Sequence, residues 1–148
     1  MPDDLATSNV NRSYSLSATS IAIFTFTLVF LYPRFASGEI DGLLFQATLV
    51  VMGVATFSLA LAAVQYYGAS LANLDDTMRG RYRRRADSFW LMGYLLLFLS
   101  PSMILFAVGL HVVGGVWLAL WIGTGLWGIR NFPRVRTAAP APPEDQSL

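Results

Sequence analysis

The stretch RGRYRRRADSFW, residues 79–90, is the most charged part of a mostly apolar chain. Five of the ten arginines fall within its first seven residues, and the chain contains no lysine. Hydrophobic residues make up 55% of the 148 residues and charged residues 13%, about half the charged share of an ordinary soluble domain. A concentrated cationic run between long apolar segments is typical of an integral membrane protein.

The charge-free segments of the chain predict where it crosses the membrane. Segments without Asp, Glu, Lys or Arg cover residues 13–33, 42–74 and 88–129. They hold 21, 33 and 42 residues, and a transmembrane helix needs about 20, so the first two hold one span each and the third holds two. We therefore predict an all-α, integral membrane four-helix bundle. Its spans are expected at about residues 15–33, 42–70, 88–110 and 114–130.

The parts outside the spans are short and polar. Residues 1–14 are expected to form a flexible or interfacial N-terminal arm, followed by the transmembrane domain over residues 15–131. Residues 132–148 are rich in proline, which predicts a disordered tail. The first apolar segment is expected to be a retained span, because Phe35 stands where signal-peptide cleavage requires a small residue.

The second helix is expected to extend beyond the bilayer. No proline interrupts the chain between Arg34 and Ser100, so this helix can continue to about Met78 and stop at Gly80. Asp75 and Arg79 lie four residues apart and would support the exposed turn.

The third helix is expected to start at a cap formed by Asp87 or Ser88. Pro101 predicts a kink, and the flanking Ser100 and Ser102 can bond the carbonyls that the proline leaves free. The short connection at residues 110–115 predicts a tight hairpin with the fourth helix.

The arginines predict the orientation, because arginine beside a span is retained on the cytoplasmic side. Four spans place nine of the ten arginines on one face and leave only Arg34 on the other. Both termini are thus expected to be cytoplasmic, in a multi-pass protein of a prokaryotic-type inner or cell membrane. The central run is interpreted as an anchor against anionic lipid headgroups, with docking of a partner as the alternative. Its members are Arg79, Arg81, Arg83, Arg84 and Arg85.

Small residues follow one another at helical spacing in the second span and recur in the fourth. Such stripes are typical of helix–helix packing in membranes, and lining of a water-filled path is the alternative. The sequence GTGLWG, residues 123–128, matches a dinucleotide-binding pattern, but it lies inside an apolar span, where close packing is the better interpretation. The candidate packing or pore-lining residues are Gln46, Gly53, Thr56, Ala60, Ala63, Tyr67, Gly125 and Gly128.

The missing residue types argue against an enzyme. The chain has no cysteine, no lysine and one histidine, His111, so we expect no catalytic site, no metal and no cofactor. No charged residue lies within a predicted span, unlike in most proton-coupled transporters. Net charge is +1 and Tyr82 is the one aromatic residue between the arginines, which argues against nucleic acid as a partner.

Two functions remain open from the sequence. The chain can be a self-assembling homo-oligomer that acts as a weakly selective channel, a pore or a membrane sensor or effector. The alternative is an accessory or scaffold subunit, in which the small-residue stripes contact a larger membrane complex.

Overall fold

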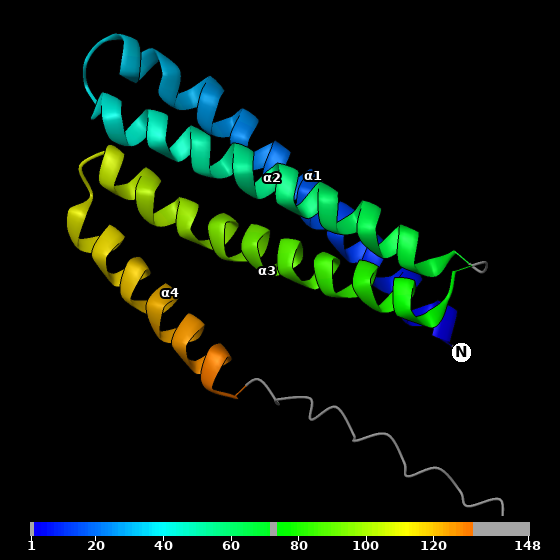
Figure 1. The fold of residues 1–148 in the computed structure, drawn as a ribbon. Coiled ribbons are helices and arrows are strands. Elements are labelled where there is room, and N and C mark those ends of the chain that lie inside the picture. The colour runs from blue at the N-terminus through cyan, green and yellow to red at the C-terminus, as the bar shows by residue number, and fades with distance from the viewer. Residues whose placement is uncertain (1, 72–73, 132–148) are drawn as a thin grey trace, which may run out of the picture.

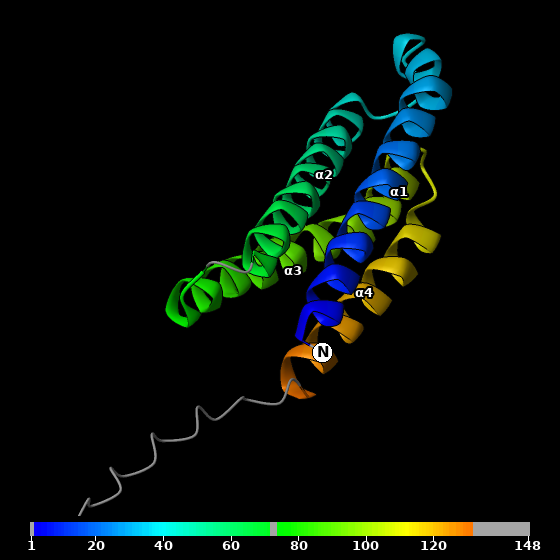
Figure 2. The ribbon, with the colours of Figure 1, turned by 90° about the vertical axis from the view of Figure 1, so that its right-hand side faces the viewer.

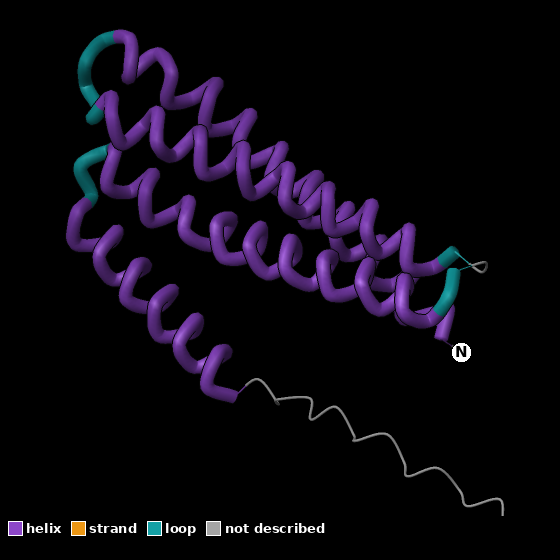
Figure 3. The backbone as a smooth tube through the Cα atoms, in the orientation of Figure 1, coloured by secondary structure: helices purple, strands orange, loops and turns teal. Residues whose placement is uncertain are grey.

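A computed structural model describes residues 2–71 and 74–131, and within them the fold is entirely α-helical (Figure 1). Short loops join the successive helices (Figure 3). The four helices are α1 (Pro2–Ala36), α2 (Gly42–Ser70), α3 (Asp76–Ala107) and α4 (His111–Asn131).

The central helix of the fold is α2, which packs against α1 on one side and α3 on another. The last helix, α4, packs mainly on α3, and it diverges from the other helices toward its C-terminal end (Figures 1 and 2). Three helices, α1, α2 and α3, are long and apolar enough to cross a membrane, whereas the apolar stretch of α4, His111–Trp127, is shorter. The chain is therefore a small all-α membrane protein.

The predicted extension of the second helix to Met78 is wrong. α2 ends at Ser70, and the extended backbone of Leu71 follows. Gly80 lies inside α3, whose first turn carries Asp76, a residue favoured at the positive end of a helix dipole. The arginine run therefore belongs to the first turns of α3, and neither Asp87 nor Ser88 caps a helix there.

The segment predicted as a flexible or interfacial N-terminal arm is helical from Pro2 onward, and residues 2–14 form the first turns of α1. These turns pack against the rest of the protein: Val10 contacts the buried cluster of Ala62, Tyr66 and Ala86. Burial of an apolar side chain on this face favours a helix over a flexible arm. Pro33 lies within α1, which continues to Ala36. The predicted tail at 132–148 lies outside the described residues.

Small polar residues form the contact between α1 and α2. The hydroxyl groups of Ser20 and Thr56 are 2.8 Å apart, and the Ser17 hydroxyl lies 3.5 Å from the Thr56 carbonyl oxygen. Short side chains let two helix backbones approach closely in a membrane. The polar face of α1 therefore packs against protein, and its buried members are Ser13, Ser17, Ser20 and Thr27.

The contact between α2 and α3 is closest at Gly93. A Cβ atom at this position would lie 2.7 Å from Cγ of Leu59 and 3.0 Å from the carbonyl oxygen of Ala55. Ala55 and Leu59 belong to a buried cluster with Leu97 of α3. Only glycine fits the space between these two backbones without movement of Leu59 or the α2 backbone.

Of the two serines that flank Pro101, one makes the contact expected from the sequence and the other bonds the neighbouring helix. Proline has no N–H group, so the carbonyl of Leu97, four residues earlier, lacks its usual helical donor. The Ser100 hydroxyl donates to that carbonyl at 2.7 Å, and α3 continues through the proline to Ala107. Ser102 instead donates to the Gly114 carbonyl of α4 at 2.8 Å.

Two tryptophans complete the contact between α3 and α4. Nε1 of Trp117 donates to the Phe98 carbonyl at 3.3 Å, and Nε1 of Trp121 donates to the Leu95 carbonyl at 3.0 Å. Each of these two indole groups therefore joins α4 to α3.

We predict that Gly93→Ala lowers the free energy of unfolding by about 1–3 kcal/mol, the usual cost of forcing a methyl group into a packed contact. Gly53→Ala is the matched control on α2, because no described atom lies within 4 Å of a Cβ built there, apart from neighbours in its own helix. Thermal unfolding of both variants in the same detergent measures the difference. Equal stability of the two variants would show that α2 and α3 do not approach closely at Gly93.

Candidate functional site

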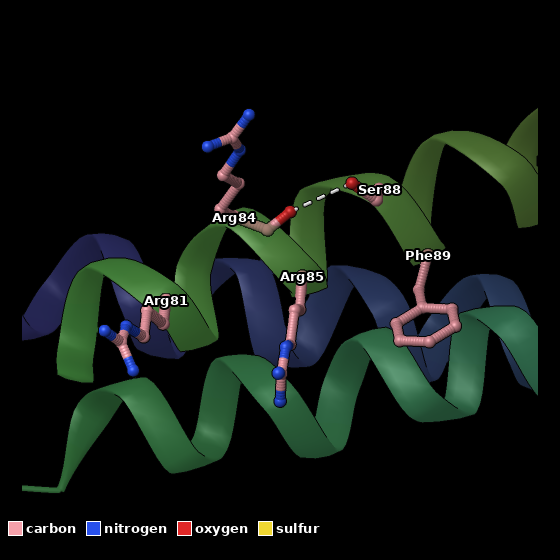
Figure 4. A pocket seen from close by; sticks show the side chains of 5 residues that line it. All are labelled: Arg81, Arg84, Arg85, Ser88 and Phe89. Atoms are coloured by element: carbon pink, nitrogen blue, oxygen red, sulfur yellow. Dashed lines mark hydrogen bonds between the residues drawn. The ribbon is translucent and has the colours of Figure 1, made fainter.

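The candidate site is the arginine-rich end of α3, where several side chains form an open groove. The groove has a volume of about 350 Å³ and is lined by Arg81, Arg84, Arg85, Ser88 and Phe89. These positions recur every three or four residues, so they share one face of the helix. In Figure 4, Arg85 and Phe89 extend toward α2, while Arg84 extends in the opposite direction.

Tyrosine side chains hold this end of α3 on α2. The Tyr66 hydroxyl donates to Oδ1 of Asp87 at 2.5 Å, and Tyr66 is 6% exposed. The Tyr82 ring lies against Gly68, where an added Cβ would be 3.2 Å from its Cδ1 atom. A hydrogen bond to a charged group typically contributes about 1.5–3 kcal/mol to stability. Because the Asp87 carboxylate is exposed, the Tyr66–Asp87 bond belongs toward the lower end of this range. These two contacts fix the direction in which the arginines project.

The arginines differ in how their charge is balanced. Nη1 of Arg79 lies 3.5 Å from Oδ1 of Asp76 in the first turn of α3. Among the side chains of residues 7–71 and 74–127, no carboxylate lies within 4.0 Å of the guanidinium groups of Arg81, Arg84 or Arg85. The groove therefore carries three positive charges without an ion-pair partner in that part of the chain, which favours anions.

The predicted packing stripe of α2 divides between two environments. One edge faces protein, because Thr56 bonds with α1 and Ala63 is buried. The other edge is uncovered in a single chain: Gln46 and Tyr67 are exposed. Ala60 is half-buried between the two edges.

Two glycines of the predicted stripes, Gly53 and Gly125, have open space beside them. Gly53 is half-buried in α2 and Gly125 half-buried in α4. In the described part of the chain, no atom of another helix lies within 4 Å of a Cβ built at either position. Gly128 also lies in α4. Gly53 and Gly125 do not serve contacts between helices of the same chain in the way that Gly93 does.

The described residues contain no group of three or more His, Cys, Asp or Glu side chains arranged to hold a metal ion. His111 is exposed at the start of α4, and its ring centroid lies 6.1 Å from that of Phe106.

The arginines were predicted from the sequence as a surface or docking site, but their neighbours Ser88 and Phe89 were not. Asp87 was interpreted as a helix cap, whereas it accepts the Tyr66 hydrogen bond from α2. Ser88 and Phe89 were not assigned to a site. The spacing could have indicated them, because residues 81, 85 and 88–89 share one face of a helix. This face becomes evident only once α3 is known to start at Asp76.

Comparisons of the chain with protein-family models, with curated proteins and with solved structures found no match. The assignment of function therefore rests on the residues of this chain.

Proposed function

We propose that the chain is a non-enzymatic, multi-pass protein of a prokaryotic-type cell membrane that crosses the membrane four times and assembles with copies of itself. The fourth crossing is supported by the length of α4, which has 21 residues and is about 31 Å long at 1.5 Å per residue. The hydrocarbon core of a bilayer is about 30 Å thick. Arg130 in the last turn of α4 can anchor its end on the same side as the arginines of α3.

The predicted orientation can be tested with single cysteines, because the chain has none of its own. We expect an impermeant thiol reagent to label Ser37→Cys on intact cells, and to label Gly80→Cys and Ser147→Cys only after permeabilisation. Labelling of both Ser37→Cys and Ser147→Cys on intact cells would indicate three crossings. Labelling of Gly80→Cys but not Ser37→Cys would reverse the orientation.

Self-assembly is proposed because small and polar residues remain uncovered on two helices of a single chain. The space beside Gly53 and Gly125 would let the backbone of another subunit approach. Exposed Gln46 would gain a hydrogen-bond partner in such a contact instead of facing lipid. Closed homo-oligomers are the commonest form of assembly.

We predict that Gly53→Leu or Gly125→Leu lowers the assembled mass of the detergent-purified protein and leaves the unfolding temperature of the single chain within about 2 °C, because the side chain enters open space within the chain. Val50→Leu, at a position that is 65% exposed, is the control at a lipid-facing site. Light scattering and native mass spectrometry measure the mass. Wild-type mass in both glycine variants would show that these faces contact lipid.

An accessory or scaffold role is the alternative, and the same uncovered residues support it. A subunit of a larger complex would purify alone as a monodisperse monomer, or would fail to accumulate without its partners. A single larger species from the protein expressed alone favours self-assembly.

A more specific proposal is that the assembled protein conducts ions. In this proposal several copies of the chain enclose a water-filled pore that is lined by the uncovered edge of α2. Such a pore would discriminate weakly among ions, because no charged side chain lies on that edge of α2. We predict that replacing Arg83, Arg84 and Arg85 with glutamine shifts selectivity toward cations, mostly at low ionic strength. Planar-bilayer recordings measure the reversal potential, and silent bilayers with verified incorporation would remove the channel and pore functions.

A further inference from the structure

The groove on α3 lies where the polar part of this helix meets its apolar part. Arg81, Arg84 and Arg85 line one end, and Phe89 lines the other. From Phe89 to Ala107 the helix contains no charged residue. At 1.5 Å per residue, Arg81 and Phe89 are about 12 Å apart along the helix axis. The groove thus joins a cationic end to an apolar wall, at the point where the charged turns of α3 give way to its charge-free part.

Among the side chains of residues 7–71 and 74–127, no ion pair engages the cations of the groove, and two of the nearby carboxylates have other partners. Asp76 lies beside Arg79, and Asp87 accepts the hydrogen bond from Tyr66. A membrane anchor needs only positive charge near the lipid. The groove has cations and an aromatic wall in a defined arrangement. A segment that only anchors the protein by its positive charge does not require such an arrangement.

We propose that this groove is a binding site for one anionic phospholipid. The guanidinium groups of Arg81 and Arg85 donate to the phosphate oxygens, as arginine does in phosphate sites generally. Arg84 also lines the groove and adds a third positive charge, with its side chain extending away from Arg85 (Figure 4). The first methylene groups of an acyl chain lie along Phe89. The site is formed by one chain, so the proposal does not depend on self-assembly or on conduction.

The chemistry selects an anionic phospholipid over the two nearest alternatives. A zwitterionic phospholipid brings an ammonium group beside three guanidinium groups, and like charges repel. Free inorganic phosphate matches the arginines but makes no use of Phe89, which is half-buried and packs against the cluster of Ala62, Tyr66 and Ala86. In a phospholipid the phosphate lies next to the acyl chains. The phosphate therefore matches the arginine end of the groove and an acyl chain matches the Phe89 end.

The test uses the full-length protein in a nonionic detergent, titrated with phosphatidylglycerol or with phosphatidylcholine of the same acyl chains. Native mass spectrometry counts the lipids retained by each chain. We expect one phosphatidylglycerol to be retained saturably, at least about tenfold more tightly than phosphatidylcholine. Each arginine near the membrane surface contributes about 1 kcal/mol, so Arg81→Gln with Arg85→Gln is expected to weaken retention about ten- to thirtyfold.

The matched control removes the same number of positive charges from the same end of the molecule. Arg12→Gln with Arg79→Gln leaves the groove intact, and we expect less than about a threefold loss. Equal losses in the two double variants would show diffuse attraction and overturn the site. Equal affinity for the two lipids would overturn it as well.

A second variant keeps the proposal testable if the loss of two arginines disturbs folding. Ser88→Asp keeps every arginine and places a carboxylate in the groove, so retention of phosphatidylglycerol is expected to fall, whereas Ser88→Asn leaves it unchanged. Inorganic phosphate at about 10 mM and constant ionic strength is expected to leave retention unchanged. Competition by phosphate would identify a free anion as the occupant, and undiminished retention by Ser88→Asp would exclude the groove.

Discussion

The close approach of α2 to its two neighbours is the constraint on which the fold depends. A lipid bilayer provides little hydrophobic driving force between helices, so contact area and short-range packing must hold them together. On one side, hydroxyl groups of α1 reach Thr56. On the other side, Gly93 of α3 admits Leu59 and the carbonyl of Ala55. Because both contacts use small residues, α1, α2 and α3 pack as one unit, and the direction of the arginine-rich end of α3 follows from it.

The helix α4 is held on α3 in a different way, by hydrogen bonds from side chains to backbone carbonyl groups. Ser102 reaches the Gly114 carbonyl, while Trp117 and Trp121 reach carbonyls of α3. Pro101 makes one such bond necessary, because it leaves the Leu97 carbonyl without a helical donor, and Ser100 supplies it. A polar group without a partner is costly in hydrocarbon. The bonds of Ser102, Trp117 and Trp121 therefore satisfy polar side chains and fix the position of α4 on α3, whereas the Ser100 bond serves α3 alone.

Charge and periodicity in the sequence predicted the helical class and the membrane character, because long charge-free segments fit few other structures. They failed at the boundary between α2 and α3. The chain has no proline there, so the sequence allowed one continuous helix, whereas the helix ends at Ser70 and restarts at Asp76. Gly93 was missed because one glycine among large apolar residues forms no repeating pattern. The Tyr66–Asp87 bond joins residues 21 positions apart, and only the pairing of α2 with α3 brings them together.

The same structure separates the small residues that pack between helices of one chain from those that have open space beside them. Gly93 and Thr56 are already used between helices of one chain. Gly53 and Gly125 lie on helices whose fold does not require them to be small, because the space beside each is open. Glycine in a helix costs up to about 1 kcal/mol relative to alanine in water. A position that bears this cost without a contact inside its own chain is better explained by a contact made outside it. In the self-assembly that we propose, folding and assembly would therefore depend on different glycines of one chain.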